Sequence, residues 1–209
     1  TEFFKKKFPD ALDLIPDLVK ELFENPTAPL GTVKCFPWNY KGNSLLLGDS
    51  AHAIVPFYGQ GMNASFEDVV EFDVFLDAHD GNWETTFKAF QTHRKVDTDA
   101  IADLAIDNFH EMKDHIANPI FQEKRKVEMA LEAEFPETYY SKYSLVTFKE
   151  TIGYNKAMTV GRAQDKAILS LLAHQKIDPK DSLTDQLKKV QKETNSILSE
   201  DMIAKTLKH

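Results

Sequence analysis

The side chains best placed for chemistry lie in residues 48–63, GDSAHAIVPFYGQGMN, directly after the apolar run Leu45–Leu47. That run predicts a short buried strand. Gly48 would let a ligand approach the backbone closely, Asp49 can accept hydrogen bonds from hydroxyl groups, and the later glycines free the loop so that peptide N–H groups point outward. The N-terminus of a helix beginning near Gly61 would stabilise a nearby anion by about 0.3–1 kcal/mol. This order predicts a site for an anionic or hydroxylated ligand, such as the edge of a dinucleotide.

The same residues allow two other interpretations: a tight strand-to-helix turn capped by Asp49, and an Asp–His hydrolase that uses His52. Glycine spacing alone does not separate the turn from a ligand site. The hydrolase lacks a nucleophilic serine in a strained elbow. A zinc site at His110 and His115 is disfavoured, because histidines five residues apart diverge by about 140° around a helix. The sequence therefore predicts no metal site.

Composition narrows the class of protein. The chain has 209 residues, 42% of them hydrophobic, a formal net charge of −8 and one cysteine, Cys35. It can bury a core, it lacks the basic stripe of a nucleic-acid-binding protein, and it has no internal disulfide. No stretch approaches the roughly 20 apolar residues that span a bilayer. The mixed charges of residues 122–134 predict a solvated helix face.

Hydrophobic periodicity predicts one β-hairpin followed by a mostly helical region. Short helices broken at Pro9 and Pro16 should open the chain. The hairpin strands are expected at Thr32–Trp38 and Ser44–Leu47, followed by a helix from about Gln60 to Asp80 that is buried over much of its surface. Further elements are expected at 83–94, 97–116, 119–136 and 150–174, with an ambiguous segment at 141–147 and a tail helix after Pro179 opened by Ser182.

These elements indicate an α/β class, or α+β for the chain as it stands. Three regions are predicted: residues 1–80 with the Gly-Asp motif, residues 81–176 as a helical region that contributes to a pocket, and residues 177–209 as an amphipathic helical tail. The thin apolar stripe of the tail predicts a helix packed on the chain's own domain or partly frayed, with a membrane or partner contact as the alternative.

The ungapped pattern GDSAHxxxPxxGQGMN from Gly48 to Asn63 resembles the second FAD-binding motif of the flavoprotein aromatic hydroxylases. In that family the aspartate contacts a ribityl hydroxyl of FAD, and amides around the Gly-Gln-Gly turn meet the isoalloxazine ring. The resemblance implies FAD binding by Gly48, Asp49, Pro56, Gly59, Gln60, Gly61, Met62 and Asn63. Gln60 is also a candidate catalytic residue, with loop bracing as the alternative; no other catalytic side chain is implied, because the flavin performs the chemistry.

Residues 56–68, 107–112 and 142–148 resemble the branch of this family that hydroxylates L-kynurenine. The implied reaction converts L-kynurenine to 3-hydroxykynurenine with O2 and NADPH, through a flavin C4a-hydroperoxide. The residues implied to bind the substrate are Phe57, Tyr58, Asn108 and Tyr143. Two alternatives remain: a related flavin hydroxylase of another aromatic ring, and a non-catalytic helical interaction domain.

The family's N-terminal Gly-x-Gly-x-x-Gly motif, its middle Asp-Gly motif and its upstream Arg and Tyr have no counterpart in the sequence. The resemblance therefore implies the C-terminal half of a glutathione-reductase-like FAD-binding hydroxylase fold, with the N-terminal half as a required partner. Eukaryotic members are anchored to the mitochondrial outer membrane by a C-terminal apolar segment, and no such segment follows Lys176. The expected location is the cytosolic face of that membrane, with this chain itself soluble.

Overall fold

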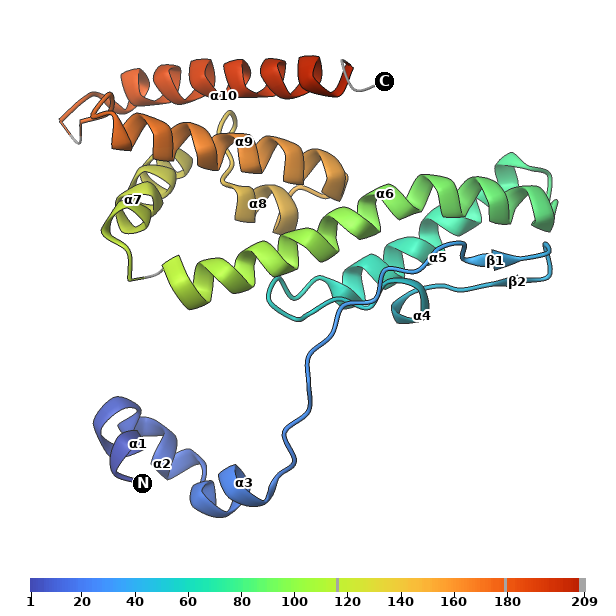
Figure 1. Cartoon of the computed structure of the whole chain (residues 1–209), viewed down its shortest axis with the longest axis horizontal. Coiled ribbons are helices and arrows are strands. Elements are labelled where there is room, and N and C mark those ends of the chain that lie inside the picture. Colours follow the sequence, from blue (N-terminus) through green and yellow to red (C-terminus); the bar gives the residue numbers. More distant parts are fainter. Residues whose placement is uncertain (116, 179, 207–209) are drawn as a thin grey trace. The chain divides into compact units, whose positions relative to one another are not determined.

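The computed structural model describes residues 1–115, 117–178 and 180–206. The chain divides into two compact units, Thr1–Leu30 and Gly31–His209. The first unit contains α1 (Glu2–Lys7), α2 (Pro9–Leu14) and α3 (Leu18–Glu24) (Figure 1). Pro9 occupies the first turn of α2, where its missing N–H has no partner to lose. The predicted breaks in this segment are confirmed, whereas the predicted region boundaries after residues 80 and 176 remain predictions.

The second unit opens with a small antiparallel hairpin. Strands β1 (Asn39–Tyr40) and β2 (Ser44–Leu45) pair with Asn39 opposite Leu45. The predicted strands Thr32–Trp38 and Ser44–Leu47 were too long. Backbone N–H groups before β1 bond outside the hairpin: Val33 donates to the Ala53 carbonyl at 2.7 Å, and Cys35 donates to the carbonyl of Ala51 in the following helix at 3.3 Å. Pro37 has no N–H to donate.

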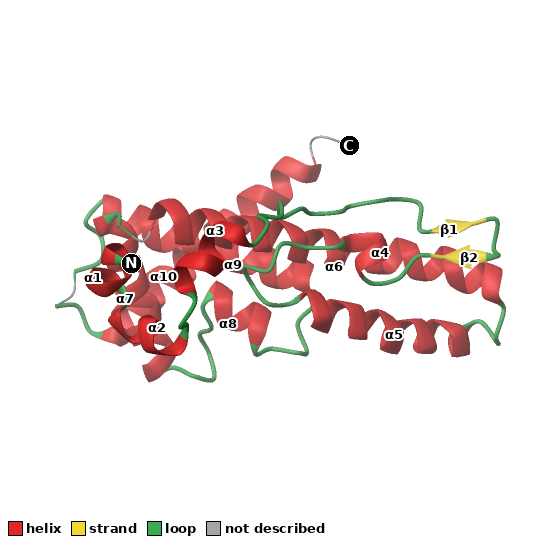
Figure 2. Cartoon of the chain, turned by 90° about the horizontal axis from the view of Figure 1, so that it is seen from below, coloured by secondary structure: helices red, strands yellow, loops and turns green. Residues whose placement is uncertain are grey.

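The remainder of the described chain is mostly helical (Figure 2). Its helices are α4 (Asp49–His52), α5 (Gly61–Ala78), α6 (Trp83–His110), the π-helix η1 (Glu111–His115), α7 (Pro119–Glu134), α8 (Lys142–Thr147), α9 (Tyr154–Ala173) and α10 (Leu183–Thr206). One small sheet with a mostly helical remainder confirms the predicted α+β class at this level. The glutathione-reductase-like fold remains a prediction.

Three predicted helices have different bounds in the structure. The helices expected at 83–94 and 97–116 form the single helix α6 followed by η1, because Lys95 and Val96 do not break a helix; residue 116 lies outside the described residues. The helix expected at 150–174 begins only at Tyr154, because Gly153 is its N-cap residue. The ambiguous segment is the helix α8, whose first turn is capped by the Ser141 side chain.

Helix α9 organises the second unit. It contacts α6, α7, α8 and α10, and α10 lies along it (Figure 1). Where α7, α9 and α10 meet, a buried cluster includes Leu131, Ile168, Leu187 and Val190. The predicted packing of the tail on its own core is therefore confirmed, and so is the opening at Ser182, whose Oγ accepts from the Asp185 N–H at 3.1 Å.

Helix α5 is far more exposed than its apolar sequence predicts. It packs on α6 through one face and buries only Ala64 and Asp68. Within the described chain no element covers its other face, where large apolar side chains are exposed: Met62, Phe66, Val69, Val70 and Val74. The prediction of a helix buried over much of its surface is wrong for this chain.

Candidate functional site

The Gly-Asp turn lies between β2 and α4. Gly48 is the N-cap residue of α4 with φ 58° and ψ −141°, a backbone conformation that residues with a Cβ rarely adopt. A Cβ at this position would also lie 3.1 Å from Ser65 Oγ. Asp49 is the first residue of α4, and its side chain is exposed. The turn thus presents the Asp49 carboxylate to the outside while its backbone is fixed from behind.

A fully buried carboxylate holds that turn. Asp68 of α5 accepts from the Gly48 N–H at 2.9 Å, from Arg94 Nε at 2.8 Å, and lies 2.5 Å from His52 Nε2. The side chains of Asp68, Arg94 and His52 are almost inaccessible to solvent, and Asp68 is 0% exposed. Burial raises the pKa of Asp68, but the bonds from His52, Arg94 and Gly48 outweigh it and hold the pKa below its ordinary value. Asp68 is therefore ionised and anchors the turn. Sequence reasoning missed it.

The second half of the motif opens α5. Gly59 has φ 68° and nothing lies within 4 Å of where its Cβ would be. Gln60 is the N-cap residue of α5 but makes no side-chain cap; its buried amide oxygen accepts from Asn63 Nδ2 at 2.9 Å and from Tyr154 Oη at 3.3 Å. The amides of the first turn, beginning at Gly61, are therefore open to an outside acceptor. Pro56, Met62 and Asn63 are exposed beside them.

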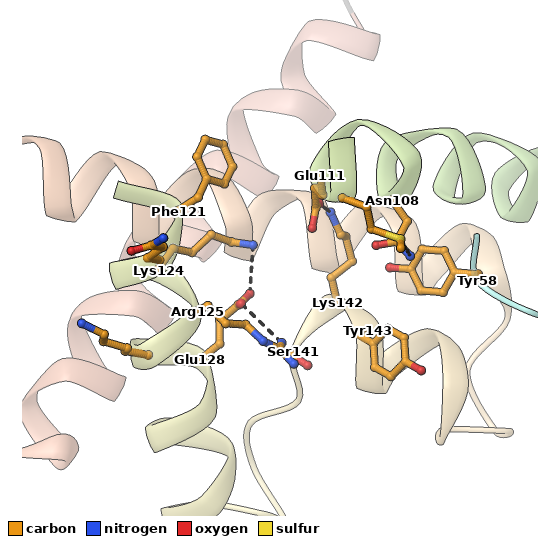
Figure 3. A pocket seen from close by; sticks show the side chains of 13 residues that line it. Tyr58, Asn108, Glu111, Phe121, Lys124, Arg125, Glu128, Ser141, Lys142 and Tyr143 are labelled. Carbon is orange, nitrogen blue, oxygen red and sulfur yellow. Dashed lines mark hydrogen bonds and ion pairs between the residues drawn. The ribbon is translucent and has the colours of Figure 1, made fainter. Parts of the chain in front are cut away.

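A pocket of about 580 Å³ lies next to this loop. Three of the predicted substrate residues line it, namely Tyr58 from the loop, Asn108 from α6 and Tyr143 from α8 (Figure 3). The rings of Tyr58 and Tyr143 stack with centroids 5.7 Å apart. Phe57 does not line the pocket; its ring packs on Phe109 at 4.8 Å. Asn108 Nδ2 donates to the Phe57 carbonyl at 2.6 Å, which ties the pocket to the loop.

The other end of the pocket is ionic (Figure 3). Lys142 pairs with Glu111 and with Asp165 at 2.6 Å, while Lys124 pairs with Asp165 at 2.7 Å and with Glu128 at 3.2 Å. Lys124 and Glu128 are buried, so the predicted solvated face at 122–134 is wrong at these two positions, whereas Arg125, Lys126 and Glu134 are exposed as predicted. Lys124 and Glu128 have the i, i+4 spacing of a surface ion pair, and the packing of α7 against α9 and α10 removes the pair from water.

Ionisation in this cluster follows from burial and pairing. Burial raises the pKa of Glu128 to about 7, against the attraction of Lys124. Burial also favours a higher pKa for Asp165, but the positive charges of Lys142 and Lys124 outweigh this effect. The pKa of Asp165 therefore lies below its ordinary value. The pKa of Lys142 is raised because Asp165 and Glu111 outweigh the lowering effect of burial. Burial likewise raises the pKa of Tyr58, so its phenol stays protonated and can donate.

Replacing Glu128 by glutamine should make stability less pH-dependent. The pKa of about 7 exceeds the ordinary 4.5, so the stability that protonated Glu128 contributes is complete below pH 4.5 and is lost as pH rises through 7. Relative to wild type, Glu128→Gln should gain on the order of 2–3 kcal/mol between about pH 5 and about pH 8. Urea unfolding at both pH values measures the gain; an equal difference at both would contradict it.

The described residues suit FAD better than a metal. Among them no group of three His, Cys, Asp or Glu side chains could hold a metal ion, and the side chain of His115 lies outside them. The exposed Asp49 carboxylate fits a ribityl hydroxyl, and the open space at Gly59 with the uncapped α5 terminus fits the edge of a flat ring carrying polar oxygens.

None of the helices in the described part of the chain is long and apolar enough to cross a bilayer.

Comparison with known proteins points the same way. A family model described as an FAD binding domain matches residues 15–80. Kynurenine 3-monooxygenase from Dictyostelium discoideum is 45% identical over a match that covers 82% of this chain and 40% of the relative. The enzyme of that name from Legionella pneumophila (strain Lens) is 48% identical, covering 78% and 36%, and that from Myxococcus xanthus is 47% identical, covering 81% and 36%. The chain thus spans about 36–40% of the length of these relatives.

Proposed function

Since the chain belongs to the kynurenine 3-monooxygenase family of FAD-dependent aromatic hydroxylases, we propose that it supplies the flavin-ring and substrate side of such an enzyme. It acts with an N-terminal half of the same enzyme that binds the ADP part of FAD. The proposed reaction hydroxylates L-kynurenine to 3-hydroxykynurenine with O2 and NADPH. A location at the cytosolic face of the mitochondrial outer membrane remains a prediction of the family resemblance.

The observation that carries the proposal is the junction of the two predicted sites. Asn108 and Tyr143 lie far apart from the flavin-type loop in sequence, yet both line one pocket with Tyr58 of that loop. The bond from Asn108 Nδ2 to the Phe57 carbonyl makes the loop a wall of the pocket. A substrate held by Asn108 and Tyr143 would therefore lie beside a ring held by the same loop.

Each residue has a definite task in this proposal. Bound FAD would supply the oxygen chemistry. Asp49 accepts a hydrogen bond from a ribityl hydroxyl, and the first-turn amides of α5 face negative charge on the ring. The stacked rings of Tyr58 and Tyr143 form an apolar wall that excludes water, while the Asn108 amide and the Tyr143 phenol bind the polar amino-acid end of the substrate.

Tyr143→Phe tests the substrate assignment, because it keeps the ring that stacks on Tyr58 and removes only the hydroxyl. The Michaelis constant for L-kynurenine should rise about five- to a hundredfold, with the FAD content unchanged. Tyr140→Phe, at a neighbouring tyrosine that does not line the pocket, should leave it unchanged. Equal constants for wild type and Tyr143→Phe would remove Tyr143 from the substrate site and leave the flavin assignment standing.

A further inference from the structure

A hydrogen-bond network that is buried except at the half-exposed Glu67 side chain reaches both ends of the flavin-type motif. At one end Asp68 accepts from the Gly48 N–H, as described above. Arg94 continues from Asp68 to Glu67, donating to Glu67 Oε2 at 2.7 Å. Tyr154, the first residue of α9, then shares its single hydroxyl proton between Glu67 Oε1 at 3.0 Å and Gln60 Oε1 at 3.3 Å. The network thus joins α4, α5, α6 and α9 behind residues 48–63.

Tyr154 also completes the other end of the motif. Its Oη lies 3.3 Å from Gln60 Oε1, although the two residues are 94 positions apart in sequence. Both side chains are buried, with Gln60 5% and Tyr154 5% exposed. Glu67 holds the Tyr154 hydroxyl, and Arg94 holds Glu67, so the position of the hydroxyl is set by charge-assisted bonds.

The restraint on Gln60 has a consequence for α5. Gln60 is the N-cap residue, and a side-chain oxygen there can accept from the amides of the first turn. The Gln60 oxygen instead faces Tyr154 and Asn63, and no side-chain cap forms. Without the Tyr154 hydroxyl, Gln60 would be freer to turn back and cap its own helix. Those amides would then be less open to a ligand.

We propose that Tyr154 is a positioning residue of the flavin site, which acts through Gln60 to keep the first-turn amides of α5 open. The proposal rests on the proposed function in one respect, namely that these amides face FAD. The role of Tyr154 is indirect, since its hydroxyl contacts the Gln60 side chain of the loop. The same network assigns Glu67 and Arg94 the task of holding the Tyr154 hydroxyl in place.

Tyr154→Phe is the test, because it preserves the buried ring and removes only the hydroxyl. In the 209-residue chain without FAD, hydrogen exchange of the Met62 and Asn63 amides should slow by about 2- to 30-fold as Gln60 caps the helix. In the complete flavin-loaded protein, the same variant should weaken FAD binding about three- to tenfold and shift the visible flavin spectrum. A general loss of stability would speed the exchange of amides, so slowing is specific to capping.

Tyr139→Phe is the matched control. Tyr139 is as buried as Tyr154, and among the described residues its hydroxyl has no hydrogen-bond partner. Its replacement should leave the α5 amides, the FAD affinity and the flavin spectrum unchanged. If wild type binds FAD but Tyr154→Phe matches it in amide exchange and in affinity, the inference is overturned. If wild type takes up no FAD, the proposed function fails, and the role of Tyr154 at a flavin site fails with it.

Discussion

Replacement of Arg94 by leucine is expected to destabilise the Gly31–His209 unit by about 3–5 kcal/mol. The guanidinium is 1% exposed and bonds to Asp68, to Glu67 and to the Ala64 carbonyl, the last at 3.0 Å. Burial lowers the pKa of Arg94, but these carboxylates outweigh it and raise the pKa. Without Arg94 the fully buried Asp68 carboxylate loses its charge partner, and only His52 and the Gly48 N–H remain to stabilise it.

Urea unfolding of the chain measures this loss. Arg162→Leu is the control, because Arg162 makes a similar bond to Asp107 at 2.7 Å but is 40% exposed. An ion pair in contact with water contributes about 0–1 kcal/mol, so the control should change little. Equal unfolding free energies for the two variants would show that the buried network does not hold the motif.

Asp49→Ala should weaken FAD binding about ten- to a hundredfold, the effect of losing one charge-assisted hydrogen bond. The Asp49 side chain is exposed, and within the part of the chain that the structure describes it has no hydrogen bond or ion pair. Its loss should therefore leave the unfolding free energy unchanged, which separates binding from stability.

Fluorescence titration of FAD into the complete apoprotein measures the affinity of the Asp49 variant. Asp77→Ala provides the control, since Asp77 is an exposed carboxylate at the far end of α5. It should bind FAD as wild type does. Retention of full affinity by Asp49→Ala would remove Asp49 from the flavin site and favour the interpretation of the motif as a tight turn.

A feature of this site could be predicted from the sequence when the residues that form it lie close together along the chain. The Gly-Asp turn, the later glycines and the start of α5 follow from local spacing, because backbone freedom and helix termini are local properties. The pocket residues Asn108 and Tyr143 came from family resemblance, since no periodicity brings α6 and α8 together.

The buried ions were not predictable in the same way. Asp68 and Arg94 are 26 residues apart, and each looks like a surface residue on its own helix. Lys124 and Glu128 likewise match a solvated helix face, and burial reverses that interpretation. The exposed face of α5 is the opposite case, since its apolar pattern predicts burial although the described chain provides no covering element. Burial is set by tertiary partners, which a one-dimensional pattern does not specify.

The most direct test of the central claim is product formation by a hybrid enzyme. The segment of the L. pneumophila kynurenine 3-monooxygenase that matches this chain, 36% of that enzyme, would be replaced by this chain. We predict a yellow protein that retains FAD and converts L-kynurenine to 3-hydroxykynurenine with NADPH and O2, and that loses FAD affinity on Asp49→Ala. A folded hybrid that takes up no FAD, or that binds FAD and forms no 3-hydroxykynurenine while the parent enzyme does, would contradict the account.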